Sequence, residues 1–266
     1  MKARELKIGF VPTMGYLHEG HSSLIDKARQ ENGAVVVSIF VNPKQFGPQE
    51  DLSNYPRDLT RDSSLCEKHG ADLIYLPSED VMYPEGYSTY VEVEGLSGIL
   101  CGASRPGHFK GVATVVLKLF NLVSPDRAYF GLKDFQQFRV IRRMALDLNL
   151  PVEVLGCPIV REKDGLAMSS RNVYLSREQR AKAGLIHQSL KEARNLIGNG
   201  ETSGERVISM MGKMISGIPD SRLDYIKICH PETLESIAEI KEKVVILVAC
   251  HVGRARLIDN LTVETA

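Results

Sequence analysis

Two histidines, His18 and His21, are the first residues of the sequence with an obvious chemical use. They end the segment Pro12-Thr-Met-Gly-Tyr-Leu-His-Glu-Gly-His, at a predicted junction between a strand and a helix. Imidazole groups can donate hydrogen bonds to phosphate oxygens and stabilise charge that develops on a transferring phosphoryl group. Gly15 and Gly20 would let the backbone approach a ligand closely, and the amides at the start of the helix can hold an anion.

Spacing alone leaves other interpretations of this segment open. A capped helix start with two surface histidines would give the same pattern. A zinc site is the weaker alternative, because the spacing differs from the i,i+4 pair of H-E-x-x-H and no third ligand follows nearby.

Four further segments carry residue types that suit recognition of phosphates, carboxylates or hydroxyls. Asn42 and Gln45 follow a very apolar run, and neutral amides suit hydroxyl and carboxylate groups. The loop at 105–111 is basic and rich in glycine, and Lys133 follows a glycine at the end of a predicted strand. Residues 168–171, Met-Ser-Ser-Arg, offer two hydroxyls and a guanidinium that can close over a triphosphate. Each segment taken singly is equally compatible with a turn or a solvated loop.

Strands and helices alternate through the first part of the chain. Apolar runs rich in β-branched residues predict strands, and apolar stripes at helical spacing predict helices. This alternation predicts an α/β fold with a mainly parallel, doubly wound sheet, which binds ligands at the carboxyl ends of its strands. The predicted strands are 7–13, 35–41, 72–76, 127–130 and 152–159, and the predicted helices are 22–32, 63–69, 111–123 and 136–148.

The pattern changes after about Arg161. Residues 176–179, Ser-Arg-Glu-Gln, resemble a capping box before a long helical pattern that reaches about Ile197, and a second helix is predicted over 205–215. Strands are predicted at 222–229, 243–252 and 256–261. We therefore expect an α/β domain over residues 1–160 and a smaller α+β C-terminal domain over residues 161–266.

Composition argues against several classes of protein. With 33 basic and 33 acidic residues among 266, the chain lacks the basic excess typical of nucleic-acid binding. Its longest apolar run is too short to span a bilayer, and no apolar segment follows the basic residues near the N-terminus. The five scattered cysteines suggest free thiols in a reducing compartment. We expect a cytoplasmic protein without a membrane or nucleic-acid partner.

The five segments in this order resemble one family. His18-Glu-Gly-His21 resembles the H-x-G-H signature of the nucleotidyltransferase superfamily related to class I aminoacyl-tRNA synthetases. The segment 168–171 falls where that superfamily has its second, mobile phosphate loop. More narrowly, the chain resembles the pantothenate synthetase (pantoate–β-alanine ligase) family over nearly its whole length, in the segments 12–21, 40–46, 105–109, 131–134 and 165–172.

The resemblance implies a two-step reaction. The carboxylate of pantoate attacks the α-phosphate of ATP, which gives pantoyl adenylate and pyrophosphate. The amine of β-alanine then attacks the acyl carbon and releases AMP. The enzyme need only position the reactants and stabilise charge.

The resemblance also implies roles for individual residues. His21 would be the proton donor and His18 would contact phosphate, together with Lys133 and Arg171. Pantoate would be bound by Gln45 and Gln137, with Asn42 in the same pocket, and no definite role follows for Arg105 and His108. The implied ATP site comprises Met14, Gly15, Tyr16, Leu17, His18, Glu19, Gly20, His21, Gly131, Leu132, Lys133, Asp134, Val160, Met168, Ser169, Ser170 and Arg171.

Members of this family use Mg²⁺ and are homodimers with a Rossmann-like N-terminal domain and a smaller C-terminal lid domain. The magnesium ligand is left open by the sequence, since Asp58, Asp62 or Asp134 could serve and the phosphates can supply most of the coordination. Family members usually carry a strand and a helix before the first motif, whereas here a short polar lead precedes Ile8. The sequence therefore also leaves undetermined which strand forms the first edge of the sheet.

Two rival functions remain to be weighed. A nucleotidyltransferase that forms a dinucleotide-like product, as phosphopantetheine and nicotinate mononucleotide adenylyltransferases do, would share H-x-G-H but not the Asn42–Gln45 pair or the long C-terminal part. A non-catalytic nucleotide-binding module would have no need of His18, His21, Lys133 and Arg171 together.

Overall fold

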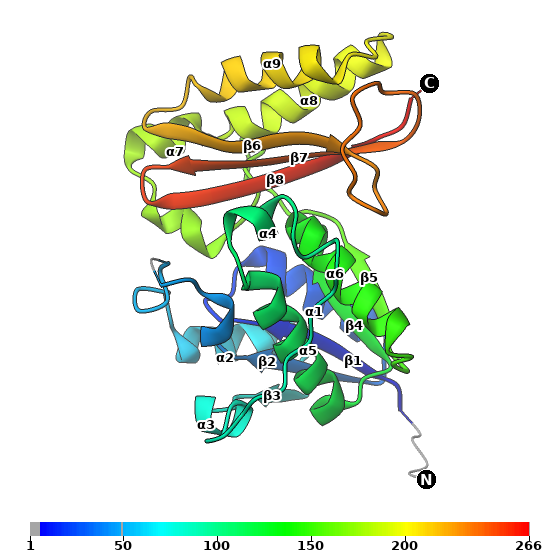
Figure 1. Ribbon diagram of the computed structural model, residues 1–266. Coiled ribbons are helices and arrows are strands. Elements are labelled where there is room, and N and C mark those ends of the chain that lie inside the picture. Colours follow the sequence, from blue (N-terminus) through cyan, green and yellow to red (C-terminus); the bar gives the residue numbers. More distant parts are fainter. Residues whose placement is uncertain (1–5, 49, 266) are drawn as a thin grey trace. The chain divides into compact units, whose positions relative to one another are not determined.

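The computed structural model describes residues 6–48 and 50–265, and the chain divides into two compact units (Figure 1). The first unit is Met1–Pro158 and the second is Ile159–Ala266, so the division falls close to the boundary predicted after residue 160. The first unit is α/β and the second contains helices and an antiparallel sheet, which confirms the predicted fold class.

The first unit is built on five parallel strands in the order β3-β2-β1-β4-β5. Adjacent residues of the central strand point to opposite faces, and both faces are covered, so Phe10 and Val11 are each fully buried. The strands are β1 (Ile8–Thr13), β2 (Ala34–Ile39), β3 (Leu73–Tyr75), β4 (Arg127–Gly131) and β5 (Glu153–Cys157). Within the described residues, β3 and β5 are the edges of this sheet.

Helices cover the sheet on both faces, as a doubly wound fold requires. Helix α1 (Glu19–Glu31) contacts β1 and β4 on the face to which Val11 points. Helices α5 (His108–Val123) and α6 (Phe135–Asp147) lie on the opposite face, in front of the sheet in Figure 1, where Phe10 joins their core. The shorter helices of the unit are α2 (Leu59–Lys68), α3 (Glu79–Met82) and α4 (Cys101–Ser104), of which α3 and α4 were not predicted.

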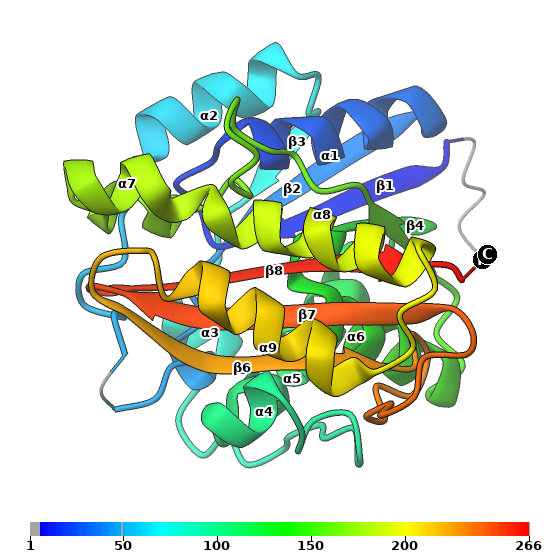
Figure 2. The same cartoon turned by 90° about the horizontal axis from the view of Figure 1, so that it is seen from above.

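The second unit has three antiparallel strands in the order β6-β7-β8. Figure 2 shows α8 and α9 side by side over these strands, and the apolar sides of both helices join one core with the sheet. The elements are α7 (Arg177–Ala183), α8 (Leu185–Gly198), α9 (Gly204–Ile215), β6 (Ser221–Cys229), β7 (Val244–Val252) and β8 (Ala255–Val263).

The single long helix predicted after Ser176 is wrong. The capping box of Ser176 and Gln179 is present, but the helix ends at Ala183 and a new one begins at Leu185. Gly184 lies between them, and a Cβ there would be 2.9 Å from the backbone oxygen of Asp164. The break therefore depends on a close packing contact with a distant residue, which helix periodicity does not reveal.

Three short 3₁₀ helices coincide with segments that the sequence singled out. They are η1 (Pro43–Gln45), η2 (Leu132–Asp134) and η3 (Ser170–Tyr174). Tight turns of this kind often mark functional segments, because they present side chains that a regular helix would turn away. Over residues 6–48 and 50–265, no helix is both long and apolar enough to cross a membrane.

Candidate active site

The order of the strands brings three of the predicted segments to one edge of the first unit's sheet. Strand β1 leads into the histidine segment, its neighbour β2 leads into η1, and its other neighbour β4 leads into η2. Because these strands are parallel, their carboxyl ends meet at the same edge. The strand order reverses between β1 and β4, which is where open α/β sheets bind ligands.

The two histidines form the start of α1. His18 is the N-cap residue, and its Nδ1 accepts a hydrogen bond from the Gly20 N–H at 3.1 Å. The His18 N–H donates in turn to Nδ1 of His21 at 3.3 Å, which makes a capping box of two imidazoles. Since Nδ1 of each ring accepts, the proton of each neutral ring is on Nε2. Each imidazole therefore has one N–H group for a phosphate oxygen.

Helix α1 begins three residues earlier than predicted, at Glu19, because a histidine cap was not anticipated. Glu19 itself is exposed in the first turn. The predicted helix-start and capping interpretation is thus realised in the structure, but the caps are the same imidazoles that are candidates for phosphate binding.

His21 is electrically neutral at physiological pH. Desolvation of its half-buried ring is the largest cause that lowers its pKa well below the usual 6.5, and the nearby charges of His18 and Lys133 act in the same direction. The Lys133 ammonium therefore lies within electrostatic reach of the His21 ring. The rings of His18 and His21 are also adjacent, with their centroids 4.2 Å apart.

Four backbone amides of this segment, those of Gly15, Tyr16, Leu17 and Gly20, have acceptors within the chain. The Gly15 N–H donates to Thr13 Oγ1 at 3.2 Å, and the N–H groups of Tyr16 and Leu17 donate to the carboxylate of Asp62, each at 2.7 Å. With the Gly20 amide bound to His18, this differs from the expectation that loop and helix-start amides would hold an anion.

Leu17, a residue of the implied ATP site, contributes its side chain to the core. It is fully buried and packs in the core between the sheet and α1. Only its backbone is available to line a ligand site. Asp62, by contrast, was considered only as a metal ligand, and no short-range pattern in the sequence links it to residues 45 positions away.

The amide side chains after β2 form a connected group. Asn42 is 1% exposed, and its Nδ2 donates to Gln45 Oε1 and to the Gly111 backbone oxygen, each at 3.1 Å. Its Oδ1 accepts from the Tyr83 hydroxyl at 2.7 Å and from the Lys44 N–H at 3.3 Å. Every polar group of Asn42 is thus used within the chain. Its place in the structure is that of a residue that orients Gln45.

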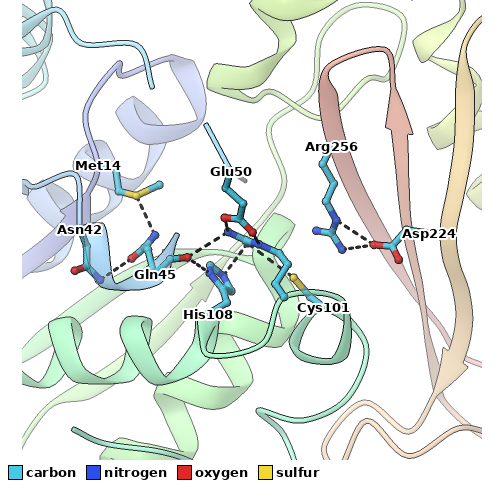
Figure 3. Close-up of polar contacts among 9 residues, drawn as sticks. Met14, Asn42, Gln45, Glu50, Cys101, His108, Asp224 and Arg256 are labelled. Atoms are coloured by element: carbon cyan, nitrogen blue, oxygen red, sulfur yellow. Dashed lines mark hydrogen bonds and ion pairs between the residues drawn. The ribbon is translucent and has the colours of Figure 1, made fainter. Parts of the chain in front are cut away.

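Gln45 is the end of this group that faces the histidine segment. Its Nε2 donates to the sulfur of Met14 at 2.9 Å (Figure 3). The close approach of α5 to η1 requires a glycine at position 111, where a Cβ would lie 2.2 Å from the backbone oxygen of Lys44. Helix α5 therefore packs directly against the backbone of η1 at Lys44 and Gln45.

Arg105 and His108 belong to a network that fixes the backbone of Gln45. Arg105 makes a two-pronged ion pair with Glu50, with Nε–Oε1 at 2.7 Å and Nη2–Oε2 at 2.6 Å. Its Nη1 donates to His108 Nε2 at 3.0 Å, so His108 Nδ1 carries the proton and donates to the Gln45 carbonyl at 2.8 Å. Figure 3 shows this chain of contacts from Glu50 to Met14. Sequence reasoning missed Glu50.

His108 makes the stability of the first unit depend on pH. Burial, followed by the charge of Arg105, lowers its pKa to about 4, against the weaker opposite effects of the hydrogen bond to the Gln45 carbonyl and of the charges of Glu50 and Asp134. The unfolded chain, with a histidine pKa near 6.5, therefore binds a proton that the folded chain does not. Stability contributed by this group is complete above pH 6.5 and is lost as the pH falls towards 4, by at most about 3 kcal/mol.

The measurement that checks this is the free energy of unfolding of the wild type and of His108→Gln between pH 7 and pH 4. We expect the variant to have the shallower pH dependence, because glutamine does not titrate. Identical slopes for the two proteins would show that His108 does not contribute.

The segment after β4 places Lys133 and Asp134 in η2. Lys133 Nζ is 3.6 Å from Asp134 Oδ2, and the lysine side chain is 20% exposed. The neighbouring glutamines in α6 differ in role. Gln136 is buried and bonds to the backbone of Leu96, Ile99 and Cys101, whereas Gln137 is half-buried. Gln137 is therefore the one of the pair that can meet a ligand.

The second unit holds the serine–arginine segment. Ser169 caps η3, with its Oγ accepting from the Arg171 N–H at 3.2 Å, and Ser170 is buried. Met168 donates from its N–H to the Val160 carbonyl at 3.0 Å, so these two predicted residues are neighbours. Asn172 anchors the segment through a hydrogen bond from its Nδ2 to Glu162 at 2.8 Å.

The part of the chain that the structure describes contains no preformed metal site of protein ligands. Among the described residues, no three or more His, Cys, Asp or Glu side chains are grouped so that they could hold a metal ion. Of the three aspartates considered, Asp58 caps α2 and Asp62 binds two backbone amides, while Asp134 keeps a 47% exposed side chain. The five cysteines, all among the described residues, form no disulfide, as predicted. All five are also buried, and burial raises the pKa of Cys66 to about 11.

The chain is similar to known proteins over nearly its whole length. The family model described as pantoate–β-alanine ligase matches residues 1–262. The pantothenate synthetase of Thermotoga petrophila is 60% identical over 260 residues, which are 98% of this chain and 93% of that protein. The pantothenate synthetase of Pseudothermotoga lettingae is 58% identical over 257 residues, 97% of this chain and 92% of that protein.

Solved structures give the same result. The crystal structure of pantothenate synthetase from Thermus thermophilus superposes with a TM-score of 0.93 at 53% identity, covering 96% of this chain and 92% of that one. The pantoate–β-alanine ligase of Francisella tularensis, complexed with β,γ ATP and β-alanine, has a TM-score of 0.81 at 36% identity and covers 98% and 91%. The chain therefore belongs to the pantoate–β-alanine ligase family, the pantothenate synthetases, ligases that condense pantoate with β-alanine.

Proposed function

We propose that this chain joins pantoate to β-alanine in two steps at the edge of the first unit's sheet. A carboxylate oxygen of pantoate attacks the α-phosphorus of ATP, and the bond to pyrophosphate breaks. The β-alanine nitrogen then attacks the acyl carbon of pantoyl adenylate, the bond to AMP breaks, and the nitrogen loses a proton. Both displacements are accelerated chiefly by positioning and by compensation of charge.

The observation that supports this most is the meeting of two kinds of group at one sheet edge. His18, His21 and Lys133 offer N–H groups and positive charge to phosphates after β1 and β4. Gln45, held by Asn42, offers an amide after β2. A phosphate-binding group beside a neutral amide group suits a nucleotide and a hydroxy acid bound next to each other.

Individual roles follow from this arrangement. His18 and His21 donate from Nε2 to phosphate oxygens, and His21 acts as a neutral hydrogen-bond donor because its pKa is depressed. Lys133 compensates phosphate charge, and Gln45 with Gln137 binds pantoate. The further ATP contacts that we propose are Met14, Gly15, Tyr16, Gly20, Gly131, Leu132, Asp134, Val160, Met168, Ser169, Ser170 and Arg171.

Mg²⁺ would enter with ATP and supply positive charge at its phosphates. Such ions are commonly held by phosphates and one or two carboxylates rather than by a cage of protein ligands. Asp134 fits this need, because its carboxylate is about half exposed beside Lys133. The family resemblance is also our ground for proposing a cytoplasmic homodimer in which the second unit serves as the smaller lid domain.

The reaction itself can be tested with purified protein, ATP, Mg²⁺, pantoate and β-alanine. We expect pantothenate, AMP and pyrophosphate in equal amounts. Formation of ADP and phosphate would contradict an adenylate, and formation of a dinucleotide-like product would favour the rival nucleotidyltransferase.

Gln45 is expected to select the acid rather than the nucleotide. Replacement by alanine removes an amide that is held in place by Asn42, so the KM for pantoate should rise about 10- to 100-fold. The KM for ATP should stay within about twofold. Steady-state kinetics with each substrate varied in turn decides this, and a selective rise in the KM for ATP would reassign Gln45 to the nucleotide.

A further inference from the structure

A carboxylate on α2 is buried against the loop between β1 and α1. The Asp62 side chain is 1% exposed, and its two oxygens accept hydrogen bonds from the consecutive N–H groups of Tyr16 and Leu17, both at 2.7 Å. Bonds from N–H groups to an ionised carboxylate are shorter and stronger than bonds between neutral groups. They connect Asp62 to Tyr16 and Leu17, which lie 46 and 45 residues away from it in the sequence.

The loop that Asp62 holds has an unfavourable backbone conformation. Gly15 has φ +84° and Tyr16 has φ 50°, so both are in the left-handed region. A residue with a side chain keeps such a conformation only where its surroundings impose it. Helix α2 contacts Tyr16 in two places. Asp62 accepts a hydrogen bond from the Tyr16 N–H, and the Arg61 guanidinium lies 5.1 Å from the centre of the Tyr16 ring.

Residues of the proposed site lie on both sides of Tyr16 and Leu17 in the sequence. Met14, on one side, accepts the hydrogen bond from Gln45 through its sulfur. His18, on the other, follows Leu17 directly and caps α1 through its ring. A shift of the Tyr16–Leu17 backbone would therefore move both the imidazole pair and the contact to Gln45.

We propose that Asp62 is a positioning residue for adenylation, whose carboxylate holds the Tyr16 and Leu17 amides and thereby fixes the place of His18. This inference rests on the proposed role of His18 in binding ATP. The Asp62 carboxylate accepts hydrogen bonds from two N–H groups to which a phosphate would otherwise be expected to bind. It thus leaves the imidazole N–H groups and Lys133 as the phosphate ligands of the first unit.

The same geometry argues against Asp62 as the magnesium ligand. Both of its oxygens face N–H groups, which carry partial positive charge and repel a cation. The side chain also lies close to the backbone, since a Cβ on Gly15 would be 3.1 Å from Asp62 Oδ2. A metal-bound role and a positioning role make different predictions for the dependence on magnesium.

The test is Asp62→Asn, which keeps the size of the side chain but replaces one acceptor by an NH₂ group that faces a backbone N–H. We expect kcat/KM for ATP to fall about 10- to 100-fold, chiefly through a higher KM for ATP, while the KM for β-alanine is unchanged. Excess Mg²⁺ should not restore the activity. Asp58→Ala is the control, because it removes the side chain that caps the same helix without touching the loop.

Three outcomes would overturn the proposal. They are unchanged kinetics in Asp62→Asn, recovery at high Mg²⁺, and a loss of active enzyme with unaltered KM values and the same thermal destabilisation as Asp58→Ala. If the wild type itself does not consume ATP with pantoate, the proposed function fails instead, and the two failures are therefore distinguishable.

A second measurement needs no variant. Hydrogen exchange of the wild-type protein should show the Tyr16 and Leu17 amides to be strongly protected although they lie in a loop, because each donates to a buried carboxylate. If these amides exchanged as fast as those of an exposed loop, the two hydrogen bonds to Asp62 would not be formed, whatever the behaviour of Asp62→Asn.

Discussion

Replacing Lys133 with alanine is expected to lower kcat/KM for ATP by about 100- to 1,000-fold, because it removes positive charge from the phosphate side of the proposed site. The ammonium group follows β4 and lies close enough to His21 to lower the pKa of that ring. The loss should appear in adenylation, measured as pyrophosphate release with pantoate, rather than in the binding of β-alanine.

Lys110 supplies the matched control. It lies on α5, 44% exposed, with its Nζ 3.7 Å from Glu92, and has no proposed part in catalysis. Lys110→Ala should keep wild-type kinetics, and both variants should unfold at temperatures close to that of the wild type. Equal activity in Lys133→Ala and Lys110→Ala would remove Lys133 from the mechanism.

Replacing His21 with alanine should reduce adenylation by a similar factor, about 100-fold or more, since it deletes the N–H donor that we propose binds the reacting phosphates. Alanine also removes the Nδ1 acceptor of the His18 N–H, so this variant alone mixes chemistry with capping. His21→Asn separates the two effects. Its side-chain oxygen can replace Nδ1 as the acceptor, while no group replaces Nε2–H.

We therefore expect His21→Asn to be folded and more stable than His21→Ala, yet nearly as inactive. If His21→Asn turned over at the wild-type rate, His21 would be a helix cap only. Because the pKa of His21 is far below 6.5, the wild-type pH–rate profile should not fall near pH 6.5 through this residue.

The sequence was sufficient to predict that the candidate segments of the first unit lie together, because parallel sheets follow simple rules. Segments such as 42–45 and 131–134 each follow an apolar run, and parallel strands place their carboxyl ends together. The doubly wound sheet, the α+β second unit and the family followed from the same alternation and from the motifs. The His18 and His21 motif needed the other segments before its use could be narrowed to a nucleotide.

What the sequence did not reveal are contacts between distant residues. Asp62 reaches Tyr16 across 46 residues and Glu50 reaches Arg105 across 55, and neither separation has a periodic signature. The break at Gly184 has the same origin, because it depends on contact with Asp164. Such contacts determine which groups are already hydrogen-bonded within the chain, so the sequence alone could not show that the amides of Tyr16 and Leu17 have a carboxylate as acceptor.

Asn42 illustrates how this changes a residue's role. From the sequence it was a candidate to bind pantoate directly, yet all its polar groups have partners within the chain. We now expect it to act through Gln45. Its effect on pantoate binding should therefore be seen only as long as Gln45 is present.

The measurement that tests the account most directly is exchange of labelled pyrophosphate into ATP in the absence of β-alanine. A pantoyl adenylate formed in a separate, reversible first step predicts exchange that requires pantoate and Mg²⁺ and is lost in Lys133→Ala. Exchange without pantoate, or no exchange under conditions in which β-alanine still gives pantothenate, would contradict a two-step adenylation at this site.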